Sequence, residues 1–158
     1  MRKFLLSTVA LMMSVALMAA GLGNGTSKAN AIDFDWANGH IQAAGTASWY
    51  RVSLSQLKKD AYDPTLALYL TNLTTEKSAV TLSVDAELVG QQFSKAYNYQ
   101  IASKDYQLWS VRSFSVSGSE ISLKNLMQYG LEEVYVQLKA NKEIALTAKV
   151  YETEDIVD

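Results

Sequence analysis

Alternation of apolar and polar side chains is the feature that most limits how this chain folds. In the clearest run, residues 80–88, five apolar residues alternate with Thr, Ser, Asp and Glu. Successive side chains of a β-strand point to opposite faces, so the pattern gives one buried face and one wet face. Such alternation is typical of antiparallel sheets. The same period of two recurs at residues 49–54, 65–70, 97–101, 134–139 and 144–151.

Turn signals suggest how some of these strands are connected. Residues 32–45 are predicted to form a hairpin of two short strands turned at Asn38-Gly39, a dipeptide typical of tight hairpins. Residues 140–143 separate the last two strands and are predicted to join them as a second hairpin. Within residues 106–116 the apolar side chains change parity, which predicts a bulge or a bend.

Helix has little room in this pattern. Short helical turns are predicted within residues 54–62 and 123–129, the second ended by Gly130 as a C-terminal cap. The remaining segments give eight or nine strands at intervals of about ten residues. We therefore predict an all-β fold, an antiparallel β-sandwich or jelly roll, formed by residues 32–158 as one domain.

The N-terminus has the order of a secretory signal peptide. Arg2 and Lys3 precede an apolar run over residues 4–20. Residues 29–31 are Ala-Asn-Ala, with a small residue at the first and third positions. We predict that residues 1–31 are a signal peptide cleaved at its last residue. A membrane anchor is the alternative, although the apolar run has only the length of a short membrane span. The predicted location is secreted, extracellular or at the cell surface, without membrane insertion after cleavage.

Composition excludes several classes of function. The chain has no Cys, which rules out disulfides and thiol chemistry, and a single His, which rules out a multi-histidine metal site. A net charge of −2 argues against nucleic-acid binding. His40 follows the predicted turn and is interpreted as an exposed side chain, and there is no Gly-x-Ser-x-Gly motif. We therefore predict that the protein is not an enzyme.

An exported acidic domain without cysteines favours a bacterial source, because small animal secreted domains usually depend on disulfides. Asn72-Leu73-Thr74 matches the N-glycosylation pattern. In a bacterial protein we interpret this match as a coincidence.

Four segments resemble the pre-peptidase C-terminal domain, a small β-sandwich appended to secreted bacterial proteases. They are residues 48–54, 63–70, 130–138 and 144–150. The chain departs from the family pattern at Ser48 and at Thr65, where the family has acidic residues. The resemblance implies a free-standing β-sandwich that binds rather than catalyses.

Related sandwiches often bind calcium, so the resemblance also directs attention to loop carboxylates. Calcium needs six to eight oxygen ligands, which loops rich in Asp commonly supply. The candidates are Asp33, Asp35, Asp60 and Asp63. We expect no cofactor, with a structural calcium ion at these residues as the one alternative.

Aromatic residues provide the candidate binding site. Trp49, Tyr69, Tyr135 and Tyr151 all have the parity opposite to the aliphatic core positions. They are predicted to form one aromatic face, with Tyr135 close to Tyr151 across the final hairpin. The alternative is that these rings cover a second hydrophobic layer or occur singly.

Two functions follow from these observations. The first is a binding module for an extracellular protein or a polysaccharide, which uses the aromatic face. The second is a structural subunit of a bacterial surface layer, fibre or biofilm matrix, in which copies of the chain associate through edge strands.

Overall fold

The computed structural model describes residues 23–57 and 63–151, and strands dominate it. The predicted all-β class, with antiparallel sheets, is confirmed. The apolar run of the predicted signal peptide lies outside the described residues. Where the structure is described, no helix is both long and apolar enough to cross a bilayer.

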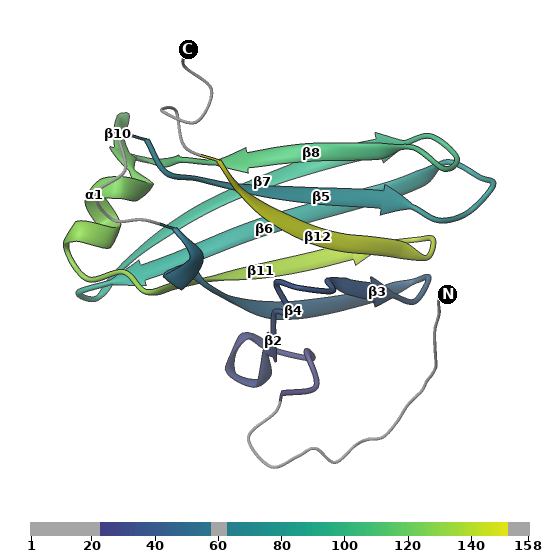
Figure 1. The fold of residues 1–158 in the computed structure, drawn as a ribbon, viewed down its shortest axis with the longest axis horizontal. Helices are drawn as coiled ribbons and strands as arrows, with labels where there is room; N and C mark the ends of the chain where they lie inside the picture. Colours follow the sequence, from purple (N-terminus) through teal and green to yellow (C-terminus); the bar gives the residue numbers. More distant parts are fainter. Residues whose placement is uncertain (1–22, 58–62, 152–158) are drawn as a thin grey trace.

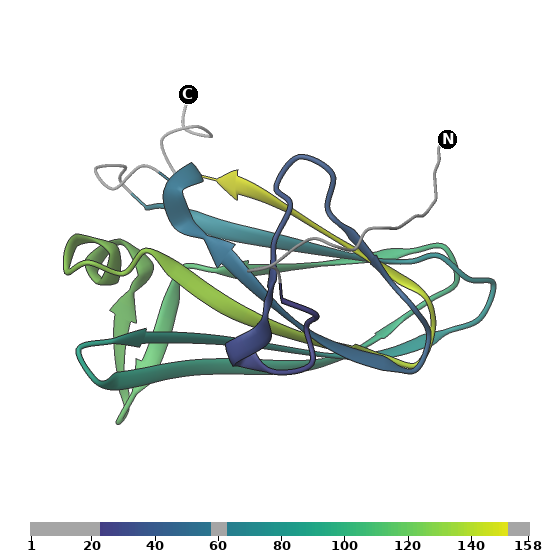
Figure 2. The ribbon, with the colours of Figure 1, turned by 90° about the horizontal axis from the view of Figure 1, so that it is seen from below.

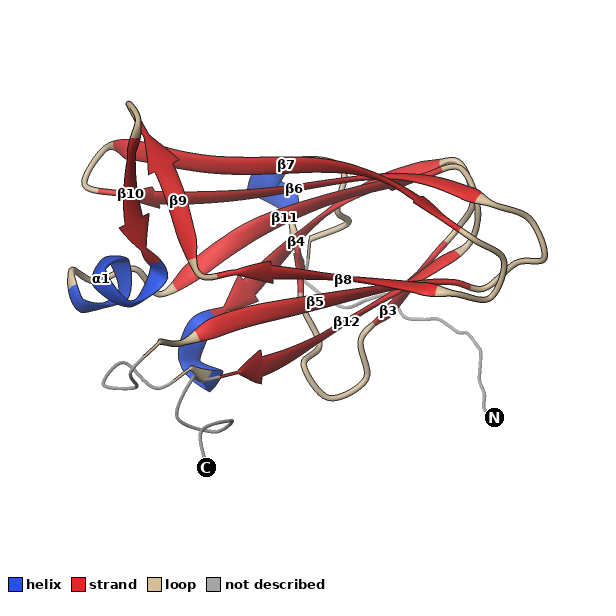
Figure 3. Cartoon of the chain, turned by 90° about the horizontal axis from the view of Figure 1, so that it is seen from above, coloured by secondary structure: helices blue, strands red, loops and turns tan. Residues whose placement is uncertain are grey.

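Two sheets form the body of the molecule, and Figure 3 shows them as two layers. The larger sheet contains, in spatial order, β2 (Ile32–Asp33), β4 (Thr46–Ser53), β11 (Glu133–Ala140), β6 (Ser78–Leu88) and β7 (Gln91–Ile101). The smaller sheet contains β3 (His40–Gln42), β12 (Ile144–Tyr151), β5 (Thr65–Asn72) and β8 (Tyr106–Val111). All neighbours in both sheets are antiparallel except β2, which runs parallel to β4.

Short elements close one end of the sandwich, as Figures 1 and 2 show. They are the hairpin of β9 (Ser113–Val116) and β10 (Ser119–Ser122), followed by helix α1 (Leu123–Gln128). The predicted bend is confirmed, because β8 ends at Val111 and β9 starts after Arg112. Gly130 follows the helix with a φ of +112°, as predicted for a C-terminal cap. Single 3-10 turns are present at Lys28–Asn30 and Leu54–Gln56.

The core lies between the inner faces of the two sheets. Val84 at the centre of β6 and Leu68 at the centre of β5 are both fully buried. The parities predicted from the alternation are confirmed for the apolar positions of β4, β5, β6 and β11 that face inward. The two sheets together contain nine strands, and the short strands β9 and β10 pair with each other in a separate two-stranded sheet.

The hairpin predicted for residues 32–45 is wrong. The chain does turn at Asn38-Gly39, and Gly39 has a φ of +70°. A Cβ there would lie 2.5 Å from the Leu146 carbonyl oxygen, so the turn needs glycine. However, β2 pairs with β4 in one sheet and β3 pairs with β12 in the other. The turn therefore carries the chain between layers instead of pairing its own flanks.

The hairpin predicted at residues 140–143 is also wrong. Strand β11 lies between β4 and β6, whereas β12 lies between β3 and β5 in the opposite sheet. Val136 and Leu146 both face the shared core and are fully buried. Alternation requires only that each strand bury one face. It cannot distinguish two strands that pair side by side from two strands that face each other across a core.

Buried amide side chains join the two layers. Asn72 at the end of β5 donates through Nδ2 to the Ile101 carbonyl at the end of β7, at 3.0 Å. Gln42 in β3 donates through Nε2 to the Leu138 carbonyl of β11, at 2.8 Å. The Tyr50 hydroxyl donates to Gln42 Oε1 at 2.9 Å, and burial raises the pKa of Tyr50 to about 12. Each sheet therefore supplies buried hydrogen-bond partners to the other.

His40 is a structural residue and not the exposed side chain that was expected. Its Nε2 accepts a hydrogen bond from the Asp35 backbone N–H at 2.9 Å. Its ring packs between Phe34 and Tyr50, with centroid distances of 5.3 and 4.9 Å. Burial lowers the pKa of His40 below 6.5, against the opposing effect of the Asp35 charge. The fold therefore holds His40 in its neutral form.

We expect the free energy of unfolding to decrease as the pH falls below about 6.5. Above the unfolded-state pKa both states hold neutral His40, whereas below it the unfolded chain takes up a proton that the folded site resists. His40 is the only histidine of the chain, so little else titrates in this range. Urea unfolding at pH 7.5 and 5.5 measures the difference. The matched variant His40→Gln keeps an acceptor and should flatten the dependence, and an equally steep dependence in that variant would refute the assignment.

Candidate functional site

The outer face of the larger sheet carries several rows of polar side chains. Residues that are paired across neighbouring strands form rows on this face. Lys139 on β11 lies opposite Ala47 on β4 and Thr81 on β6, and Thr81 lies opposite Asn98 on β7. The next row on the same face joins Trp49, Gln137, Ser83 and Ala96, and the row beyond it joins Arg51, Tyr135, Asp85 and Ser94.

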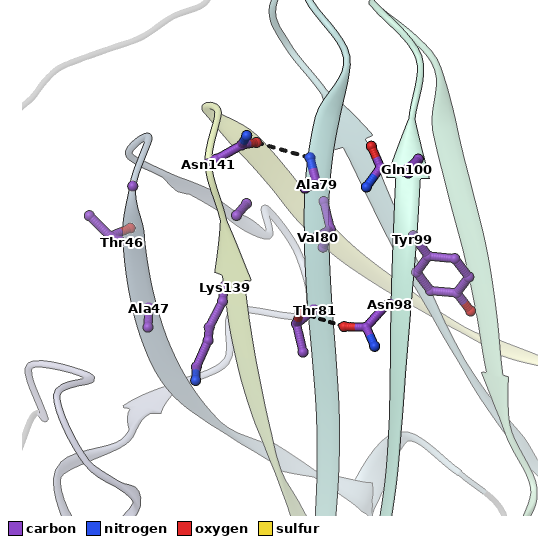
Figure 4. Close-up of a pocket in the computed structure, with 12 residues that line it drawn as sticks. Thr46, Ala47, Ala79, Val80, Thr81, Asn98, Tyr99, Gln100, Lys139 and Asn141 are labelled. Atoms are coloured by element: carbon purple, nitrogen blue, oxygen red, sulfur yellow. Dashed lines mark hydrogen bonds between the residues drawn. The ribbon is translucent and has the colours of Figure 1, made fainter.

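An open groove of about 520 Å³ crosses one end of this face. Its walls are formed by residues of β4, β11, β6 and β7 and of the turns that follow β11 and precede β4. Ala47 and Ala79 line it with small side chains, and Lys139 and Asn98 line it with polar groups. Figure 4 shows these side chains across the four strands.

Hydrogen bonds hold two polar side chains of the groove in place. Thr81 Oγ1 donates to Asn98 Oδ1 at 2.7 Å, and the Asn98 amide nitrogen is directed away from Thr81 in Figure 4. Asn141 Oδ1 accepts hydrogen bonds from the Ala79 N–H at 2.9 Å and from Ser78 Oγ at 3.3 Å. These amides therefore present their nitrogens as oriented donors, which suits a hydroxyl-rich ligand.

The predicted aromatic site is only partly assembled on this face. Trp49 and Tyr135 both lie half-buried on the larger sheet, on the neighbouring strands β4 and β11. Trp49 is opposite Gln137, so the two rings are diagonal neighbours. Tyr135 donates through its hydroxyl to Glu133 Oε2 at 2.7 Å, and this hydrogen bond is the main reason that its pKa is raised.

The other two predicted aromatic residues belong to the smaller sheet, so the single four-residue face is wrong. Tyr69 lies on the outer face of β5, with Tyr106 at a ring distance of 6.1 Å and the Lys149 ammonium 5.7 Å above its ring. The backbone of Tyr151 pairs with Thr65 of β5, and its side chain is outside the described part of the structure. The separation follows from the placement of β11 and β12 in different sheets.

Lys28 covers the pair of aromatic residues on the larger sheet. Its Nζ lies 2.9 Å from Asp85 Oδ2, 5.5 Å from the centre of the Trp49 ring and 5.7 Å from that of Tyr135. Lys28 belongs to residues 23–31, the purple segment beside β4 in Figure 1. The backbone N–H of Trp49 donates to the Gly25 carbonyl at 2.8 Å and anchors this segment.

The predicted calcium ligands do not gather. Asp33 binds the Arg51 guanidinium, and Asp63 lies 3.5 Å from that of Arg112. Asp35 accepts hydrogen bonds from residues 37 and 38, and these outweigh its burial and lower its pKa. Asp60 lies outside the described residues. Among the described residues, no group of three or more His, Asp or Glu side chains is arranged to hold a metal ion.

Sequence patterning alone does not identify the polar residues of the groove. Thr81, Asn98 and Lys139 were recognised only as the wet positions of alternating strands. All three have the outward parity of their strands. That parity indicates a shared surface only when the strand order β4-β11-β6-β7 is known. Lys28 lies within the predicted signal peptide, so its sequence position gives no indication of a role in the folded domain.

Comparisons with models of known protein families and with curated proteins find no match. The resemblance to the pre-peptidase C-terminal domain therefore stays a prediction.

Proposed function

We propose that this chain is an exported, non-enzymatic binding module whose ligand is an extracellular polysaccharide. The ligand would lie on the outer face of the larger sheet. One observation carries the proposal: an open groove across four strands presents oriented amides, a lysine and a hydroxyl, and two aromatic residues follow it on the same face.

The chemistry of the groove supports a sugar ligand over a compact small molecule. Sugars offer many hydroxyl groups, which pair with amides such as Asn98 and Asn141, and apolar ring faces, which stack on aromatic side chains such as Trp49. The groove is open instead of enclosed, which suits a long chain that enters and leaves at the ends. None of its lining residues is Asp, Glu or His, so the groove walls supply no carboxylate pair for glycoside hydrolysis.

We further propose that the fold is a jelly roll with β2, β9 and β10 as additions. The support is the strand order, because β3-β12-β5-β8 faces β4-β11-β6-β7. Double-sheet jelly rolls have eight strands, and lectin domains are among the proteins built on them. A fold alone does not define a function, so the proposed function rests mainly on the residues of the groove.

The proposal predicts which variants lose binding. The test is binding to a panel of immobilised polysaccharides: β-glucan, xylan, chitin and chitosan. Asn98→Ala and Lys139→Ala should each weaken binding to the recognised polymer about tenfold, because each removes an oriented polar group from the groove. The matched controls are Gln107→Ala and Lys149→Ala, which remove an amide and a charge from the smaller sheet and should leave binding unchanged. Absence of binding to every polymer, or equal losses in all four variants, would refute the proposal.

A second candidate function is a structural subunit that assembles through edge strands. The observation that favours it is β8, an edge strand without charged residues or Pro. Natural proteins usually protect such edges with charges or Pro. Tyr106 and Leu108 on β8 are 59% and 37% exposed, and Tyr69 lies between them and β12. Sedimentation of the same samples separates the candidates, since polymers that grow with concentration would favour this one.

A further inference from the structure

Lys28, Trp49, Tyr135 and Asp85 form a site that already contains a ligand group. One ammonium is held by a carboxylate at 2.9 Å and lies 5.5 and 5.7 Å from two ring centres. A cation within about 6 Å of an aromatic ring centre is attracted by the ring's negative face, and cages of this kind recognise ammonium groups. We call Trp49, Tyr135 and Asp85 the ammonium cage.

The cage is held in place independently of Lys28. Asp85 accepts hydrogen bonds from Ser94 Oγ at 2.9 Å and from Gln92 Nε2 at 3.3 Å, both from the neighbouring strand β7. The Asp85 side chain is only 14% exposed. Both aromatic residues lie on paired strands inside the sheet. These contacts come from the sheet itself and do not involve Lys28.

Lys28 lies in the segment that the sequence predicts to be removed. Cleavage after Ala31 would take away Lys28 and the Gly25 carbonyl that accepts from the backbone N–H of Trp49. The cage would then be an anionic, aromatic site open to solvent. Its Asp85 and Tyr135 lie two rows beyond Thr81 and Lys139 of the groove, which is four residues or about 13 Å along a strand. An oligosaccharide of a few units spans that distance.

We propose that the ammonium cage binds the primary ammonium group of an amino-sugar polymer, and that Lys28 occupies it as a built-in competitor until residues 1–31 are removed. This inference rests on the proposed function, because the rest of the polymer would lie in the groove. The charge of the cage selects a free amine over the neutral N-acetylated sugar. The negative faces of the aromatic rings attract a cation, whereas a neutral hydroxyl group gains no such attraction.

The test compares glucosamine hexamer with N-acetylglucosamine hexamer by calorimetric titration. The exported protein, with its N-terminus determined by sequencing, should start at Ile32 and bind the amine form at least tenfold more tightly. Asp85→Asn should remove that preference, whereas Asp105→Asn, the same change in a distant turn, should retain it. Full chain produced without export should bind the amine form about tenfold more weakly, and Lys28→Met in that chain should restore the affinity.

Each contrary outcome is distinct. Equal binding of the two hexamers, an unaffected Asp85→Asn variant, or a full chain that does not respond to Lys28→Met would overturn the inference. An exported N-terminus that retains Lys28 would overturn the role of processing. Asp85-dependent binding of Nα-acetyl-lysine amide without binding of the amine hexamer would assign the cage to a protein's lysine and also overturn it. If the two hexamers bind equally and their binding still depends on Asn98 and Lys139, the proposed function stands while this inference fails.

Discussion

Replacing Leu68 by Ala is expected to lower the free energy of unfolding by about 2–4 kcal/mol. Leu68 is fully buried at the centre of β5, where it lies opposite Trp109 on one side and Ala148 on the other. Truncation removes the transfer free energy of the side chain and leaves a cavity that strands fixed by hydrogen bonds on both sides cannot fill.

The control for this prediction is Leu108→Ala on the adjacent strand. Leu108 undergoes the same chemical change but lies on the outer face, 37% exposed. Its loss should cost well under half as much, because less apolar surface is buried there. Urea unfolding with tryptophan fluorescence measures both variants. Equal costs for the two would mean that the faces of β5 and β8 are assigned incorrectly.

Replacing Asn72 by Ala is expected to cost about 2–4 kcal/mol, because more than one buried group loses its partner at about 1–3 kcal/mol each. Asn72 is fully buried. Its Nδ2 donates to the carbonyls of Glu76, Ile101 and Ala102, and its Oδ1 accepts from the backbone and hydroxyl of Thr74. The same burial removes the amide nitrogen from access, which fits the interpretation of its glycosylation pattern as coincidental.

Two further variants test this role of Asn72. Asn72→Asp keeps the shape but replaces the donor by a buried carboxylate, so its stability should rise again at low pH as the acid becomes neutral. Asn98→Ala is the exposed control and should change stability by no more than about 0.5 kcal/mol. An Asn72→Ala variant as stable as the Asn98→Ala variant would refute the inter-sheet role of Asn72.

The all-β class and the inward faces of the long strands could be predicted because alternation records burial directly. Leu66, Leu68 and Leu70 share a face in the sequence and are buried together in the structure. The pairing of strands could not be predicted in the same way. Turns at Asn38-Gly39 and at residues 140–143 have hairpin composition, but both carry the chain from one sheet to the other.

The candidate site was harder to predict for the same reason. Trp49 and Tyr135 are neighbours because β4 and β11 are neighbours, and Tyr69 is separated from them because β5 lies in the other sheet. Parity identifies an outward residue but not the sheet to which its strand belongs. Parity and polarity also fail for Asn72 and Gln42. Their polar side chains suggest exposure, yet both are buried and form hydrogen bonds across the sandwich.

The most direct test of the central claim is an amide NMR titration of the protein with the tightest-binding oligosaccharide of the polysaccharide panel. We expect shifts at Thr81, Asn98 and Lys139 on the outer face of the larger sheet, with Tyr106 and Leu108 on β8 unchanged. Shifts confined to β8, or none at saturating ligand, would contradict it.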